Sequence, residues 1–257
     1  MTNLQARFAM YNPRNTYGGS PFGRRNAFGS SRFQYQTLPH GQESTQASGL
    51  ISKVMGLLAF SFLFAFVGTI FGSIIGLGMG GYWVVAIGGL VVLIALNFLI
   101  QKPGINLFLL YLFTFLEGMA LSPIIAYYTR YQSNILGEAF LITALTSFGL
   151  AGYAWTTKRD FSRLGDYLFW GLILLLVAGL VNIFIFHSTV FVLLISLIGI
   201  AIFSGLILYD VQRAKYMADT MPNAIGLTVS IFLDVLNLFL YILRVLSILQ
   251  GGDRNRS

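Results

Sequence analysis

Two acidic residues interrupt apolar runs near the C-terminal end of the chain. Asp210 ends the run SGLILYD, and Asp234 lies within SIFLDVLNLFLYIL. Acidic side chains at membrane depth mark proton transfer, cation binding or a bond to a neighbouring helix. Two carboxylates held close together share a proton and titrate as one coupled unit. Asp210 and Asp234 would form such a proton-sensitive site if the last helix descends or breaks so that Asp234 comes near the level of Asp210, which the sequence permits.

The same two carboxylates could also hold a cation. Carboxylate oxygens are the ligands that Ca²⁺ prefers, and protons compete with the ion for them. Our hypothesis is that the singly protonated pair Asp210 and Asp234 holds the cytoplasmic end closed by a hydrogen bond, and that Ca²⁺ binds the two acids only transiently. A change in its protonation then loosens the last helix. The alternative, in which each acid bonds a neighbouring helix and does nothing more, stays open.

The composition identifies the class of protein that must hold these acids. Hydrophobic residues make up 56% of the 257 residues, charged residues only 10%, and the mean hydropathy is +0.75. A chain of this kind is an integral membrane protein, with the lipid bilayer as its main partner. It contains no cysteine, and His40 and His187 lie far apart, so we expect neither a zinc site nor another cofactor. The net charge of +7 comes from loops and tails, which suits anionic lipids and not nucleic acid.

Seven apolar segments follow one another with polar or glycine-rich breaks between them. They cover about 54–77, 82–101, 105–128, 135–156, 167–186, 189–208 and 224–249, with boundaries accurate to about two to four residues. We expect an all-α integral membrane protein with seven transmembrane helices, because helices satisfy their own backbone polar groups in lipid. The stretch DVQRAKYMADTMPN, 210–223, has the composition of a loop. Glycines at 68, 72, 76 and 80 form a face suited to close helix contact.

The positive charges predict how the chain is oriented and divided. We expect a flexible basic tail at 1–48, a membrane domain at 49–250 and a short C-terminal tail at 251–257. A cytoplasmic N-terminus places twelve of the sixteen Lys and Arg residues on one side, in agreement with the usual bias of cytoplasmic loops. Arg254 and Arg256 then favour a last segment that re-enters the membrane, so the side of the C-terminus stays open.

Further polar residues lie on the apolar segments. The last segment carries one stripe at helical spacing, formed by Ser230, Asp234, Asn237, Tyr241 and Arg244. Such a stripe cannot face lipid, so we expect this helix to be central and wrapped by the other six, with Asn237 and Arg244 as possible residues of an ion pathway or latch. Glu117, in the third segment, is either a second stop for a cation or proton or a structural hydrogen-bonding group. Arg244 either neutralises an acid or extends to the membrane surface.

The order of several short motifs resembles that of the Bax inhibitor-1 family of membrane proteins. The motifs are FLEGMALSPI, SFGLAGYAWTTKRDFSRLGDYLFWGL, LILYDVQ and IFLDVLNLFLYILRVL, within residues 50–250. The resemblance implies six helices around a seventh and a proton-sensitive calcium leak in the members where transport is known. It also implies an aspartate pair from the last two helices, which is Asp210 and Asp234 here.

The resemblance is incomplete at one position. Members that act as leaks carry an arginine in the second helix, tied to the aspartate pair, whereas segment 82–101 has no basic residue. Either Lys102 or Arg213 takes its place, or the transport behaviour differs.

Three classes of function follow from these observations. The leading one is a pH-sensitive calcium or cation leak channel in a prokaryotic inner membrane, with Ca²⁺ and H⁺ as its ligands. A second is a modulator of a membrane-bound ATP-dependent protease that acts through the N-terminal tail. The third, an intramembrane aspartyl protease, lacks support because Ile-Phe-Leu precedes Asp234 where such enzymes carry Gly-x-Gly. We therefore expect no enzymatic activity.

Overall fold

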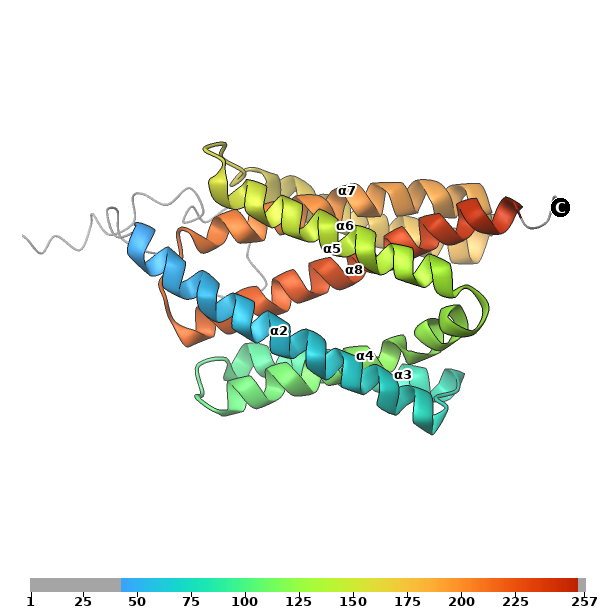
Figure 1. The fold of residues 1–257 in the computed structure, drawn as a ribbon, viewed down its shortest axis with the longest axis horizontal. Helices are drawn as coiled ribbons and strands as arrows, with labels where there is room; N and C mark the ends of the chain where they lie inside the picture. Colours follow the sequence, from blue (N-terminus) through green and yellow to red (C-terminus); the bar gives the residue numbers. More distant parts are fainter. Residues whose placement is uncertain (1–42, 254–257) are drawn as a thin grey trace, which may run out of the picture.

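In a computed structural model that describes residues 43–253, these residues fold into seven long helices and one short π-helical turn (Figure 1). The elements are α2 (Glu43–Ile75), α3 (Met79–Leu99), α4 (Ile105–Tyr131), α5 (Ser133–Thr156), α6 (Leu164–Val181), η1 (Asn182–Phe186), α7 (Thr189–Ala214) and α8 (Met221–Asp253). All seven long helices are long and apolar enough to cross a membrane. The predicted all-α, seven-span fold is confirmed.

The helix ends differ from the sequence prediction in the region that matters most. The loop predicted at 210–223 is wrong at both ends, because α7 continues to Ala214 and α8 already begins at Met221, which leaves only 215–220 as the connection. The polar residues of this last turn remain helical because they are buried within the protein. α2 begins at Glu43, six residues before the predicted boundary at 49, and most of the predicted tail lies outside the described residues.

The helices form two groups with α8 between them. α2, α3 and α4 lie together on one side in Figure 1, and α5, α6 and α7 lie on the other. α8 packs against α2, α4, α5 and α7, whereas in the described part of the chain α3 packs on α4 and α6 on α7. Every residue from Asn223 to Phe232 is buried. The first half of α8 is therefore enclosed on all its faces.

α2 and α4 cross at unusually close range. A methyl group added at Gly68 would overlap the Phe115 carbonyl oxygen, and one added at Gly118 would overlap that of Ala65. The Thr69 hydroxyl group donates to the carbonyl oxygen of Gly118 at 2.9 Å. Small residues permit this contact, and backbone packing then supplies most of the attraction between helices in lipid. The predicted glycine face is used at positions 68 and 72, but Gly76 lies beyond the end of α2 with φ of 68°.

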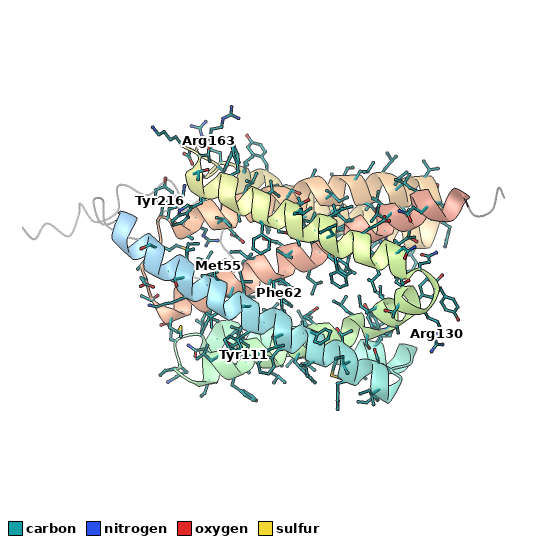
Figure 2. The ribbon with its side chains drawn as sticks, viewed as in Figure 1. Met55, Phe62, Tyr111, Arg130, Arg163 and Tyr216 are labelled. Carbon is teal, nitrogen blue, oxygen red and sulfur yellow. The ribbon has the colours of Figure 1, made fainter. Side chains whose placement is uncertain are left out.

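Basic residues gather at one end of the bundle, which we call the basic end. This end contains the start of α2, the α3–α4 turn, the α5–α6 loop and the end of α7, and Arg163 marks it in Figure 2. Its basic residues are Lys53, Lys102, Lys158, Arg159, Arg163, Arg213 and Lys215. Arg130 lies at the opposite end (Figure 2). There a single residue, Gln132, joins α4 to α5.

Candidate gating site

The first predicted acid, Asp210, is buried near the end of α7 and has a basic partner. An Arg213 guanidinium nitrogen, Nη1, lies 3.5 Å from Asp210 Oδ1, one helical turn away. The exposed fractions of the two side chains are only 7% for Asp210 and 8% for Arg213. The Arg213 guanidinium also lies over the Tyr209 ring, 5.8 Å from its centre. The charge of Asp210 is thus balanced inside the protein and not by water.

The second predicted acid, Asp234, has no exposed surface at all. It lies on α8 about 20 Å along the helix axis from Met221, at 1.5 Å per residue. α8 packs lengthwise against α7 and runs without a break from Met221 to Asp253. The structure therefore buries both acids, on two neighbouring helices, at membrane depth for Asp234 and near the basic end for Asp210.

The other predicted site residues lie in different surroundings. Asn237 is half-buried and donates to the Leu233 carbonyl oxygen of its own helix at 2.7 Å. Arg244 and Lys102 are exposed. Of the two basic residues considered as partners of the acid pair, Arg213 is the one that contacts Asp210.

Glu117 faces another interface. A Cβ atom built on Gly89 of α3 would lie 3.3 Å from Glu117 Oε1. The carboxylate therefore sits between α3 and α4, and α3 is not among the helices that pack on α8 in the described residues.

Sequence reasoning missed Gln212, which lies between Asp210 and Arg213 and is 3% exposed. The backbone N–H of Phe161 donates to Gln212 Oε1 at 2.6 Å, and Gln212 Nε2 donates to the Arg159 carbonyl oxygen. One side chain of α7 thus binds the α5–α6 loop twice. The only sequence signal was a neutral amide between two charged residues, which does not distinguish a buried residue from an exposed one.

Two further contacts of basic side chains lie at the basic end. Lys53 at the start of α2 forms an ion pair with Asp219, 2.9 Å away in the α7–α8 connection. The ammonium group of Lys215 lies 5.6 Å from the centre of the Trp155 ring. Partial burial lowers the pKa of Lys215 below its ordinary value.

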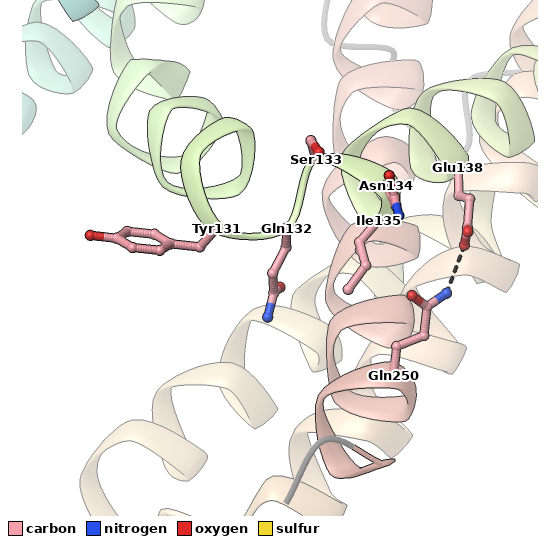
Figure 3. Close-up of a pocket in the computed structure, with 7 residues that line it drawn as sticks. All are labelled: Tyr131, Gln132, Ser133, Asn134, Ile135, Glu138 and Gln250. Carbon is pink, nitrogen blue, oxygen red and sulfur yellow. Dashed lines mark hydrogen bonds between the residues drawn. The ribbon is translucent and has the colours of Figure 1, made fainter. Parts of the chain in front are cut away.

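The opposite end carries a polar cavity of about 240 Å³ between the α4–α5 turn and the end of α8 (Figure 3). It is lined by Tyr131, Gln132, Ser133, Asn134, Ile135, Glu138 and Gln250. Gln250 Nε2 donates to Glu138 Oε2 at 2.6 Å and so ties α8 to α5. Within residues 43–253 no group of three or more His, Cys, Asp or Glu side chains could hold a metal ion.

Comparisons with known proteins assign the chain to a family. The family described as inhibitor of apoptosis-promoting Bax1 matches residues 47–251. A membrane protein of Vibrio cholerae is 37% identical over 166 residues, which cover 62% of this chain and 73% of that protein. Mouse protein lifeguard 4 is 33% identical over 163 residues, and the Golgi anti-apoptotic protein of vaccinia virus strain Lister is 32% identical over 161; each match covers 63% of this chain and 66% of the relative. The chain therefore belongs to the Bax inhibitor-1 family of membrane proteins.

Proposed function

We propose that this protein is a pH-sensitive cation leak, with Ca²⁺ as its main ion, gated by Asp210 and Asp234. The observation that carries the proposal is the complete burial of Asp234 on a helix that packs along α7, where Asp210 is also buried. An acid at this depth is retained when protons or cations use it. Membership of the Bax inhibitor-1 family supports the same assignment.

Protonation supplies the switch in this proposal. While Asp210 is ionised, Arg213 balances its charge at 3.5 Å. When Asp210 takes up a proton, the guanidinium loses its charged partner in a poorly solvated site, which is strongly unfavourable. The end of α7 then rearranges against α8, and the path along Asp234 opens or closes.

Other charged groups at the basic end act on this switch. They are Arg213 and Lys215, which follow Asp210 in the sequence, Asp166 of α6, Arg159 of the α5–α6 loop, and the Lys53–Asp219 ion pair. Asp234 lies deeper, on the helix that packs against α7. Asp166 interacts electrostatically with Tyr209, the residue next to Asp210. The pH response therefore belongs to a coupled group and not to one carboxyl.

We infer further that the basic end faces the cytoplasm of a prokaryotic inner membrane. Lys and Arg residues collect in loops on the cytoplasmic side. The basic end carries seven such residues, while Arg130 lies at the other end (Figure 2). This orientation places the N-terminus in the cytoplasm and lets Asp210 sense cytoplasmic pH.

Flux measurements test the gating proposal. Purified protein is placed in liposomes loaded with a Ca²⁺ dye, and influx is followed between about pH 5 and pH 8 for the wild type, Asp210→Asn and Asp234→Asn. Glu138→Gln is the matched control, because Glu138 is exposed at the opposite end of the bundle. We expect the two buried substitutions to flatten or shift the pH profile and the control to leave it unchanged.

Two results would count against the leak. Unchanged profiles in both buried variants would remove the acids from the gate. An absence of flux from well-folded protein at every pH would favour the modulator of a membrane-bound ATP-dependent protease, which is then tested by deleting residues 1–42.

A further inference from the structure

The polar residues at the end of α7 are less exposed to water than their position suggests. Asp210, Gln212 and Arg213 lie in its last two turns, next to a surface loop, yet they are only 3–7% exposed. Charged and amide side chains at the end of a transmembrane helix normally reach the aqueous interface. Something at the basic end must cover them, and two segments of the chain are in position to do so.

The first covering segment is the α5–α6 loop, which Gln212 holds through the loop backbone. Its amide accepts from the N–H of Phe161 and donates to the carbonyl oxygen of Arg159, so both hydrogen-bonding groups of one side chain are used. These bonds join residues 51 and 53 positions apart in the sequence. A leucine or methionine would fill the same space and could not hold the loop.

The α5–α6 loop is also held by contacts within itself and with α5. Asp160 Oδ1 accepts from the Ser162 N–H at 2.8 Å, and Thr157 Oγ1 accepts from the Arg159 N–H at 3.2 Å. The Phe161 ring lies 6.2 Å from the Tyr153 ring of α5. The basic side chains of Lys158 and Arg163, in contrast, are exposed.

The second covering segment is the start of α6, which follows the loop directly. A Cβ atom built on Gly165 would lie 2.7 Å from the Tyr209 ring, so the backbone of α6 packs flat on this tyrosine. Tyr209 in turn lies under the Arg213 guanidinium. Loop and helix start therefore form one continuous cover over the last turns of α7.

We propose that Gln212 is a positioning residue that holds the α5–α6 loop, 157–163, as a cap over the Asp210–Arg213 pair. The cap closes the pair to water and ions from the basic end, and release of the two Gln212 bonds opens it. In the proposed leak this cap closes the cytoplasmic entrance to the gate, so the inference rests on the proposed function. The position of the loop and the access to Asp210 can nevertheless be measured without any flux.

Limited proteolysis tests whether Gln212 holds the loop. Trypsin cleaves after Lys158, Arg159 and Arg163, and intact-fragment masses separate these cuts from cuts elsewhere. The loss of each hydrogen bond raises the open population by about fivefold, so Gln212→Met should raise the cleavage rate by about tenfold or more. Gln250→Met is the matched control, because it removes one bond between α8 and α5 at the opposite end.

Chemical labelling tests whether the loop covers the acid. A water-soluble carbodiimide reacts with accessible protonated carboxyl groups, and mass spectrometry reads the label at Asp210 as a function of pH. We expect Gln212→Met to raise labelling of Asp210 severalfold and to leave labelling of the exposed Glu138 unchanged. Phe161→Pro removes the first of the two bonds from the loop side, together with the Phe161 ring contact, and it serves if the α7 variant fails to fold.

The possible results separate the cap from the gate. Faster cleavage together with greater labelling of Asp210 supports the cap, even if no variant and no wild type conducts ions, in which case the leak alone fails. Wild-type cleavage in both variants overturns the role of Gln212. Faster cleavage with unchanged labelling shows that the loop is held but covers nothing. Equal effects in Gln250→Met mean general loosening and also overturn the proposal.

Discussion

The buried ion pair between Asp210 and Arg213 allows a quantitative test of how dry the site is. At 3.5 Å and an effective dielectric constant of about 20, the two charges attract each other by about 5 kcal/mol. Removing one partner leaves the other charged in a poorly solvated place, and such changes cost about 3 to 5 kcal/mol of stability. We therefore expect Asp210→Asn and Arg213→Met each to destabilise the protein by about 3 kcal/mol or more.

The double variant separates this explanation from simple loss of packing. With both charges gone, no buried charge stays uncompensated, so the double variant should be more stable than either single one. Since each single change costs about 3 kcal/mol or more, the coupling energy should then exceed about 3 kcal/mol. Arg213→Met also loses the contact with Tyr209, which the cycle cancels. The measurement is equilibrium unfolding of the full chain in lipid–detergent micelles. Additive single effects below about 1 kcal/mol are typical of exposed pairs, and would refute the burial argument.

Two further predictions concern packing and charge elsewhere. Gly118→Ala should destabilise the protein by about 2 kcal/mol or more, because the added methyl group overlaps the Ala65 carbonyl oxygen and forces α2 from α4. Gly149→Ala, whose methyl group would meet open space, is the control and should be neutral or stabilising in the same unfolding assay. Burial lowers the pKa of Lys215 from its ordinary 10.5, so the unfolded chain keeps this proton to higher pH than the folded protein does. Stability should therefore rise with pH in the interval just below 10.5, and a wild-type rise that persists in Lys215→Met would contradict this.

Hydropathy predicted which segments cross the membrane, but little about how the helices pack against one another. Each of the seven spans follows from its apolar composition, because backbone groups in lipid must be satisfied within the segment. The last turn of α7 was misassigned because Asp210, Gln212 and Arg213 read as polar, and only their neighbours in space make them buried. Composition along the chain carries no information on those neighbours.

For the candidate site, the sequence likewise identified the unusual residues but not their partners in space. Intramembrane acids are rare enough to be noticed, so Asp210 and Asp234 could be selected from the sequence alone. The choice of Arg213 over Lys102 as partner needed coordinates, since both are basic residues at helix ends. Gln212 could not be selected at all, because its two partners are backbone groups, which every residue has.

The one-residue connection at Gln132 has a mechanical consequence for the basic end. α5 starts directly after Gln132 and extends for 24 residues, so it is a helix about 36 Å long that reaches the basic end. A tilt of about 5° about its Gln132 end would move its other end by about 3 Å, the length of a hydrogen bond. That far end carries the loop held by Gln212. A small tilt of α5 at one face of the membrane would therefore be enough to make or break these hydrogen bonds at the other face.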